Sequence, residues 1–229
     1  MGNWNIEFAV ASGIYFRRYI FIIYLDLRTH TLIHLSALAA RYDYRSRLSE
    51  AIVQAKSNAI VWREEVYECF LQLYLFAGFP AALEAMRALR KAWPDTESEN
   101  AVIPGIEMFD YPAFLDRGQK LYEEIYSRNA ETVRKEMLRL SPELAAWAVV
   151  EGYGKTLSRP GLDILTRELA IVALLVQLGW DRQLFSHILG AQNAGAAMQD
   201  IREAIIIGAM DDMPKQERAL ELLDRAKMK

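Results

Sequence analysis

The sequence predicts an all-α protein built from two related helical repeats, with an atypical segment before the first repeat. Apolar residues such as Leu32 and Leu35 recur at the three- and four-residue steps of a helix. Residues 166–178 are apolar at nearly every position, which predicts a helix that is buried on most of its sides. Residues 48–55 and 184–191 share one pattern of apolar positions, and this likeness indicates a duplication.

In the first half of the chain, helices are expected up to a proline-rich boundary. Residues 64–76 are rich in good helix formers, and Gly78 and Pro80 then break or kink the helix before 81–91 continues it. Residues 93–112 carry prolines and an acidic cluster, which is typical of an exposed linker. The expected organisation is an atypical segment (1–25), a first repeat (26–92), a linker (93–113) and a second repeat (114–229).

In the second half, capping residues mark where helices begin and end. Ser141, followed by a proline and a glutamate, is a strong helix start. Gly179 is expected to end the buried helix, and Asp181 to cap the next one. We interpret residues 152–155 as a helix C-cap, because they are too short and wrongly placed for a phosphate loop. The remaining expectations are helices over 114–127, from the cap Asn129 to about 140, over 198–209 and from Pro214, with a turn at 158–161.

The first 25 residues do not follow the helical pattern. Residues 14–25 are rich in aromatic and β-branched side chains, so strands or a hairpin around Ser12 and Gly13 fit them. A buried helix fits equally well, because periodicity cannot separate the two in so short a run. Residues 59–62 are also unusually apolar for a turn. Exposed apolar patches mark interfaces, so both segments are candidates for contact with another subunit, whether natural or introduced.

The repeat is visible in more than one helix. Asp26 and Thr29 fall opposite Asp163 and Thr166 at an offset of 163 − 26 = 137. Loop-length changes explain drifts of one residue between matched segments. We therefore predict a tandem duplication in which each copy contains three helices. Such internal pseudo-symmetry often extends into a cyclic oligomer.

Composition excludes some classes of partner. Among 229 residues the formal net charge is −3, with 52% hydrophobic and 25% charged residues, as in an ordinary globular protein. No basic excess is present to neutralise phosphates, so neither nucleic acid nor a membrane surface is an expected partner. The apolar run near residues 19–25 is too short to span a bilayer and lacks the features of a secretory signal.

Cysteine and histidine usage narrows the chemistry. The single cysteine, Cys69, cannot form an internal disulfide, so a cytoplasmic location fits best. Cys69 lies in a core-like helix and is interpreted as a small buried side chain. His30 and His34 share a helix face, but we interpret them as an exposed pair and expect no metal site.

Both halves contain short motifs that carry a family resemblance. The first half has Tyr74, Gly78, Phe79, Pro80 and Ala81. The second half has Arg159-Pro160-Gly161-Leu162-Asp163, Thr166-Arg167-Glu168-Leu169, Gln183-Leu184-Phe185-Ser186-His187, Ala191 and Gly195. These motifs resemble the carboxymuconolactone decarboxylase and alkyl hydroperoxidase D group of proteins. The resemblance covers about residues 26–91 and 114–212 and is more specific for the fold than for the reaction.

The resemblance implies a candidate active site in the second repeat. Trp180 and Gln183 stand where the thiol-dependent branch has two cysteines, so a dithiol peroxidase is argued against on chemical grounds. By likeness to the decarboxylase branch, His187 would be the general acid or base and Glu168 would orient it or share its proton. Arg167, Trp180 and Gln183 would be substrate-binding residues, and Arg167 could equally be an ordinary salt-bridging arginine. No cofactor is implied.

Two hypotheses of different classes follow. The first is a lyase-like protein that acts on a small carboxylated lactone or keto acid through His187 and Glu168. The second is a non-catalytic helical assembly subunit that self-associates through the N-terminal segment and residues 60–62. A structural explanation of His187, as a core histidine bonded to a carboxylate, stays open beside the catalytic one. Analogy with single-repeat relatives favours a homotrimer.

Overall fold

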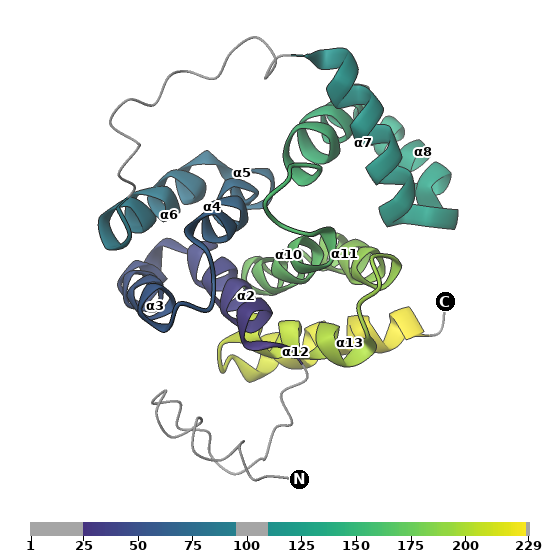
Figure 1. Ribbon diagram of the computed structural model, residues 1–229. Coiled ribbons are helices and arrows are strands. Elements are labelled where there is room, and N and C mark those ends of the chain that lie inside the picture. Colours follow the sequence, from purple (N-terminus) through teal and green to yellow (C-terminus); the bar gives the residue numbers. More distant parts are fainter. Residues whose placement is uncertain (1–24, 95–109, 228–229) are drawn as a thin grey trace, which may run out of the picture.

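The computed structural model describes residues 25–94 and 110–227, and every regular element in those ranges is a helix (Figure 1). The predicted all-α class is therefore confirmed. The strand, hairpin and helix interpretations of the N-terminal segment lie outside the described residues, as does most of the predicted linker. Within the described ranges, no helix is both long and apolar enough to cross a membrane.

The first half contains a run of helices joined by short connections. The expected helix over 64–76 is divided at Gln72, where the Leu75 amide donates a tighter three-residue hydrogen bond to the Gln72 carbonyl at 3.2 Å. The elements are α2 (Leu27–Ala39), η1 (Tyr42–Tyr44), α3 (Arg45–Asn58), α4 (Arg63–Leu71), α5 (Leu73–Phe76) and α6 (Gly78–Ala92).

The second half begins with a helix that starts earlier than expected. Asp110 caps it by accepting a hydrogen bond from the Ala113 amide, so it begins at Tyr111 instead of residue 114. The elements are α7 (Tyr111–Tyr126), η4 (Ser127–Asn129), α8 (Ala130–Leu140), α9 (Pro142–Trp147), η5 (Ala148–Leu157), α10 (Ile164–Leu178), α11 (Asp181–Asn193), α12 (Met198–Ala209) and α13 (Met213–Lys227).

The capping expectations are mostly confirmed, with two corrections. Ser141 caps α9 through a hydrogen bond from the Leu144 amide, and Gly179 ends α10 with a left-handed φ of 73°. Asp181, expected as a cap, is the first residue of α11, and its carboxylate pairs with Arg218. The expected C-cap at 152–155 is wrong, because these residues continue η5, a π-helix of 10 residues.

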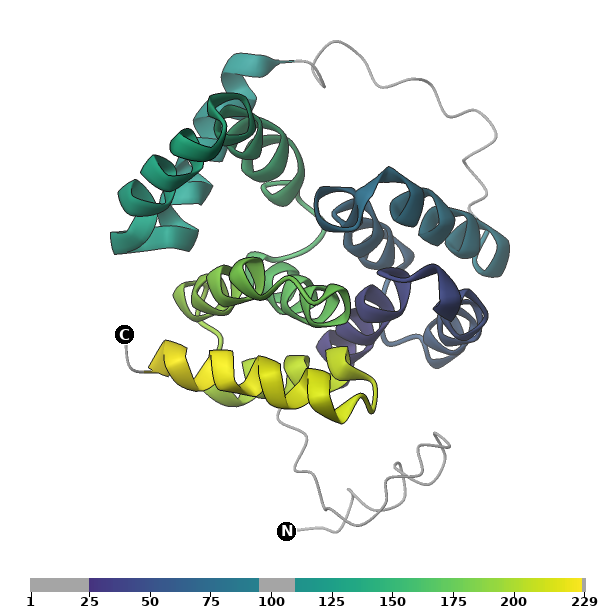
Figure 2. The same ribbon diagram turned by 180° about the vertical axis from the view of Figure 1, so that it is seen from behind.

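Helix α10 is the centre of the fold. All its residues from Thr166 to Gln177 are buried, which confirms the prediction made from its apolar run. It packs against α2, α11 and α12, and Figures 1 and 2 show it between the first-half helices and the C-terminal pair α12 and α13. Each fully buried leucine, isoleucine or valine contributes about 1.5–3 kcal/mol of transfer free energy. Because α10 buries many such residues against helices of both halves, it stabilises the packing of the two halves on each other.

The central helices α2 and α10 begin in the same way. The Asp26 carboxylate accepts a hydrogen bond from the Thr29 amide at 2.9 Å, and Asp163 accepts one from the Thr166 amide at 2.8 Å. These two helices also pack directly on one another. The shared cap agrees with the predicted duplication, which stays a prediction.

Helices α7 and η5 form a closely packed pair beside α8 and α9, on one side of α10 (Figure 1). Glycines allow the close approach: a Cβ at Gly118 would lie 2.1 Å from the Val149 carbonyl oxygen, and one at Gly154 would lie 1.8 Å from the Phe114 oxygen. Any larger residue at these positions would push the helices apart. This packing fixes the side of η5 that faces α7.

Candidate functional site

The structure brings together the two residues that the sequence predicts as catalytic. Glu168 lies in α10 and His187 in α11, and the two helices pack side by side. His187 Nδ1 and Glu168 Oε2 are 2.8 Å apart, a hydrogen-bond distance. Both side chains are buried: Glu168 has no exposed surface and His187 is 6% exposed. Water screens such a pair very little, and the hydrogen bond holds the imidazole ring in one orientation.

The side chains around the pair come from α5 and α7, and a glycine of α11 allows close packing there. The Phe76 ring, at the end of α5, meets the His187 ring edge-on with centroids 5.2 Å apart. Gly190 lets α11 approach Glu168 and α7, because a Cβ there would lie 2.6 Å from Glu168 Oε2 and 3.0 Å from Ile125 Cγ2. The pair therefore lies where the first half, α10, α11 and α7 meet.

A cluster of three tyrosines from α7 and η5 lies beside this pair. The Tyr153 hydroxyl donates a hydrogen bond to the Tyr126 hydroxyl at 2.9 Å. Burial, together with the charge of Glu168, raises the pKa of Tyr126 to about 12 and that of Tyr153 well above its usual value. Tyr122 packs against both rings, but its hydroxyl donates to the Ala130 carbonyl. Tyr126 and Tyr153 therefore stay protonated at neutral pH, with Tyr153 as the donor and Tyr126 as the acceptor of the hydrogen bond between them.

Only one of the two oxygens of the Glu168 carboxylate is hydrogen-bonded. Oε2 is hydrogen-bonded to His187, whereas Oε1 is fully buried and has no hydrogen-bond partner among the described residues. Buried carboxylate oxygens normally accept hydrogen bonds, because desolvating them without a donor is costly. An oriented imidazole with a buried acid behind it can hold or move a proton at Nε2, the ring nitrogen that Glu168 does not engage.

Arg167, predicted as a substrate-binding residue, is held inside the protein. Its Nη2 donates to Glu68 Oε2 at 2.8 Å and to the Arg159 carbonyl at 3.0 Å, and its Nε donates to the Leu162 carbonyl at 3.2 Å. Arg167 has no exposed surface, and Glu68 is 4% exposed. The alternative of an ordinary salt-bridging arginine describes this geometry, which joins α4 to α10.

Trp180 and Gln183, the other predicted substrate-binding residues, lie at the surface near the start of α11. Trp180 is 58% exposed, and Gln183 is exposed as well. Gln183 precedes His187 by four residues and so shares its helix face, whereas Trp180 lies about one turn further away. The structure thus places both outside the buried pair.

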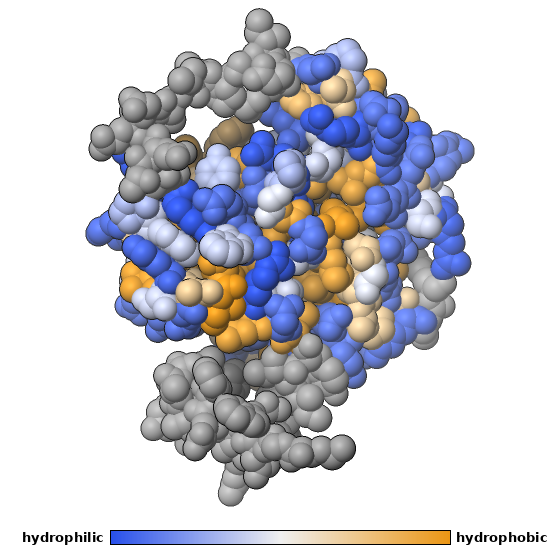
Figure 3. Space-filling model, in the orientation of Figure 1, coloured by the Kyte–Doolittle hydropathy of each residue, from blue (hydrophilic) through white to orange (hydrophobic). Residues whose placement is uncertain are grey.

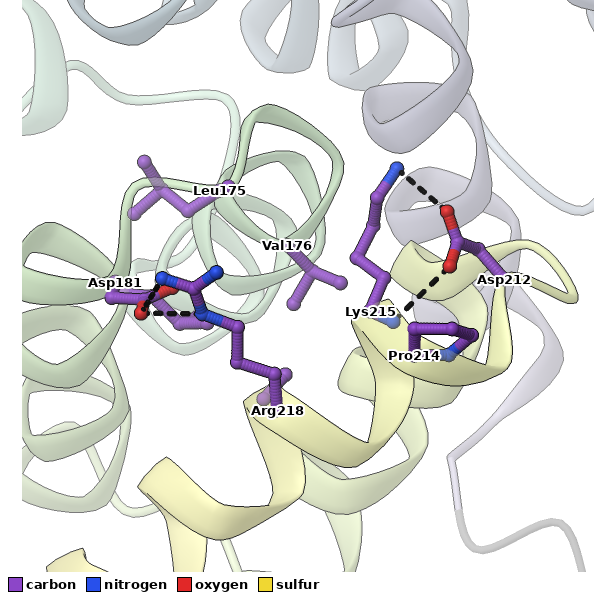
Figure 4. A pocket seen from close by; sticks show the side chains of 10 residues that line it. Leu175, Val176, Asp181, Asp212, Pro214, Lys215 and Arg218 are labelled. Carbon is purple, nitrogen blue, oxygen red and sulfur yellow. Dashed lines mark hydrogen bonds and ion pairs between the residues drawn. The ribbon is translucent and has the colours of Figure 1, made fainter.

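The described cavities lie away from the pair. One, of about 280 Å³, opens between α10, α11 and α13, and the charged groups that line it pair with one another: Asp181 with Arg218, and Asp212 with Lys215 (Figure 4). A second, of about 250 Å³, lies between η4 and α11 and is lined by Asn129, among others. On the face shown in Figure 3, apolar residues gather near the centre, over the region of α10 and α11.

The cysteine and the two other histidines of the chain lie in the first half, in α4 and α2. Cys69 is fully buried, as expected, and burial raises the pKa of its thiol to about 12, so it stays protonated. His30 and His34 are half-buried, which corrects the expectation of an exposed pair. Burial, together with the nearby His30 and Arg47, lowers the pKa of His34 to about 4. Among the described residues, no group of three or more potential metal ligands comes together.

The fold and the buried pair define a class of protein: an all-helical chain with a histidine and a glutamate held on two adjacent helices. Residues 143–225, which include both residues, match the model of the carboxymuconolactone decarboxylase family. This match confirms the resemblance seen in the motifs of the second half.

A curated relative extends the comparison beyond this region. "Peroxisomal protein 2" of Schizosaccharomyces pombe is 29% identical over 133 residues, which are 56% of this chain. The match spans 59% of the length of that relative, so its whole-protein properties do not carry over directly.

Sequence patterns alone missed part of the site. Tyr126 lies at the end of a predicted helix, and Tyr153 falls in a segment interpreted as a helix C-cap, so neither stood out. Phe76 ends the segment 64–76, which was predicted only as a helix, and the structure places its ring against His187. The motif that identifies His187 and Glu168 contains no signal for side chains that come from α5, α7 and η5.

Proposed function

We propose that this protein is a cofactor-independent carboxy-lyase that acts on a small carboxylated lactone or keto acid. The observation that carries the proposal is the buried hydrogen bond between His187 and Glu168, at 2.8 Å, with one glutamate oxygen unpartnered. The family match over residues 143–225 supports the same class of reaction. The chemistry needs one proton-transferring group in an apolar, water-poor site, and the pair provides it.

The reaction can be written with the residues of this site. The bond between the substrate carboxylate and the carbon that carries it breaks, carbon dioxide leaves, and the electron pair of the bond forms an enolate. His187, as its imidazolium, then donates a proton to the carbon that carried the carboxylate. Glu168 stabilises the charged ring and holds its orientation. A low dielectric around the pair strengthens this stabilisation and destabilises the ground-state carboxylate.

Two exposed residues near the start of α11 are proposed to contact the substrate. Gln183 is an exposed hydrogen-bonding residue one helical turn before His187, which suits contact with a polar substrate group at the surface. Trp180 supplies an exposed aromatic face nearby. Arg167 is left out of the proposed binding set, because Glu68 and backbone carbonyls already engage its guanidinium.

The test is carbon dioxide release from carboxymuconolactone and a panel of related lactone and keto acids. We expect release from at least one substrate, with a loss of about 10²–10⁴-fold in kcat for His187→Gln, the usual contribution of a general acid or base. Glu168→Gln should lower kcat less, because the imidazole remains. Arg218→Gln, which removes a surface ion pair at the cavity of Figure 4, is the control and should leave kcat unchanged.

A second function is favoured by one specific observation. Trp62, in the apolar turn noted in the sequence, is 75% exposed, whereas its neighbour Val61 is buried. An exposed tryptophan suits a subunit interface, and a homotrimer and a cytoplasmic location remain our proposals for this chain. The relative from Schizosaccharomyces pombe is named as peroxisomal. Failure of a well-folded protein to release carbon dioxide from any substrate would favour the assembly function.

A further inference from the structure

The unpartnered oxygen of Glu168 requires a hydrogen-bond donor. Glu168 has no exposed surface, so bulk water cannot solvate Oε1, and no described residue donates to it. Leaving such an oxygen without a donor is among the costlier defects of a folded interior. Its partner oxygen is already fixed by His187, so the carboxylate cannot rotate to a better position without breaking that bond.

A hydroxyl proton in the same region has no acceptor. The Tyr126 hydroxyl receives a hydrogen bond from Tyr153, and within the described residues its own proton is donated to no acceptor. A Cβ at Gly190 would lie 2.6 Å from Glu168 Oε2 and 3.0 Å from Ile125 Cγ2, so the end of α7, where Tyr126 follows Ile125, lies beside the carboxylate. The raised pKa of Tyr126, to which the charge of Glu168 contributes, agrees with this placement. The hydrogen bond from Tyr153 polarises Tyr126 and makes it a stronger donor. A buried acceptor, Glu168 Oε1, and a half-buried donor, the Tyr126 hydroxyl, thus lie in the same region without a direct bond.

We infer that Glu168 Oε1 and the Tyr126 hydroxyl together bind one hydroxylic oxygen, which donates to the glutamate and accepts from the tyrosine. Water can fill this role in the free protein. The enol or hydroxyl oxygen of a small ligand can replace it, and this second occupant rests on the proposed function. A carbonyl oxygen does not fit, because it accepts hydrogen bonds but cannot donate one to Glu168.

The surroundings suit a small, flat ligand with one hydroxyl group. Phe76 presents its ring beside His187, and Ile125 contributes an apolar side chain next to Gly190. Apolar walls with a few convergent polar groups are typical of ligand sites. An enol is also the form that an enolate takes after protonation on oxygen, so the site would hold a species on the proposed reaction path.

Nuclear magnetic resonance on the full chain tests the water arm. We expect nuclear Overhauser contacts between a long-lived water and ring protons of Tyr126 and His187, whose signals are easy to assign because the chain has 3 histidines. Tyr126→Phe should abolish these contacts. Tyr122→Phe is the matched control: it removes a hydroxyl of the same cluster that donates to the Ala130 carbonyl instead, and it should leave them intact.

Phenol and anisole test the ligand arm, because phenol donates and accepts hydrogen bonds whereas anisole only accepts. Phenol should displace the water contacts and bind at least about tenfold more tightly than anisole, the factor expected for one hydrogen bond, and Tyr126→Phe should remove this preference. Water contacts that phenol does not displace would support the site with water as its only occupant. The absence of both water contacts and a preference for phenol would overturn the inference. Neither arm measures turnover, so failure here is distinct from failure of carbon dioxide release.

Discussion

Single side chains decide how Arg167 should be understood. Arg167 directly precedes Glu168 and was predicted to bind substrate. In the structure its guanidinium instead donates a hydrogen bond to the carboxylate of Glu68 in α4. Adjacent residues of a helix point about 100° apart, so neighbours in the sequence can serve different interfaces. Glu68 also accepts hydrogen bonds from Arg159, so one buried carboxylate pairs with two cations.

Glu68→Gln should therefore destabilise the protein by about 3–5 kcal/mol, because it leaves the buried charge of Arg167 without a counter-ion. Urea unfolding followed by circular dichroism measures this difference. The control is Asp43→Asn, which breaks an ion pair with Arg41 whose side chains are 42% and 57% exposed. Exposed pairs are worth under about 1 kcal/mol, so equal losses in the two variants would contradict a structural role for Glu68.

The sequence predicted individual site residues unevenly. Glu168 and His187 were predicted because the motifs around them resemble those of the carboxymuconolactone decarboxylase group, and the structure places them on the consecutive helices α10 and α11. Tyr126 and Tyr153 were not, because they reach the pair from α7 and η5, and no local pattern encodes which distant helix will cover a given face. The spacing of residues also does not reveal how deeply they are buried. The four-residue spacing of His30 and His34 suggested an exposed pair, whereas both are half-buried in α2 of the structure.

Among the helices, η5 departs furthest from the sequence-based expectation. Glycines usually end helices, so Gly152 and Gly154 were interpreted as part of a cap. In the structure both lie inside the π-helix, and Gly154 is needed for contact with α7 instead of for a turn. The wider π-helical turn also carries Tyr153 toward Tyr126, in keeping with the frequent occurrence of such turns at functional sites.

The two glycines of η5 provide a matched pair of variants. Gly154→Ala should lower stability by roughly 1–3 kcal/mol, because its Cβ would lie 1.8 Å from the Phe114 carbonyl oxygen and must push α7 away. Gly152→Ala meets no atom within 4 Å and should be neutral or slightly stabilising, since alanine favours helical backbone over glycine.

Thermal unfolding distinguishes the two glycine variants. A loss of roughly 1–3 kcal/mol corresponds to several degrees in Tm for a chain of this size, and the Gly152 variant should not show it. Similar Tm values for both variants would mean that the close approach of α7 and η5 is not needed for stability.

For the chain as a whole, the class and most helix positions could be predicted. Periodic apolar residues and caps such as Ser141 and Gly179 act locally, so the sequence displays them directly. The arrangement of the halves could not be derived in the same way, because it depends on which apolar faces meet. Helix α10 contacts helices of both halves, and its uniform burial was the one global feature that a local run of residues revealed.

The packing of α2 against the other helices predicts how the free energy of unfolding changes at acidic pH. His34 has a folded pKa of about 4 against an ordinary value of 6.5, because burial and the nearby His30 and Arg47 disfavour its charged form. Between these two pH values the unfolded chain binds a proton that the folded chain does not. Stability is therefore fully present above about pH 6.5 and falls as the pH drops toward 4, by roughly 3 kcal/mol over the window.

The variant His34→Gln should remove this contribution. Urea unfolding at a series of pH values should give parallel stability profiles for the two proteins above about pH 7.5, whatever constant offset the substitution introduces. Between pH 6.5 and 4 the profile of the variant should be flatter by up to about 1.4 kcal/mol per pH unit, the slope of one proton. Profiles that stay parallel through this window would show that His34 titrates alike in the folded and unfolded chains, and that the packing of α2 does not exclude its charged form.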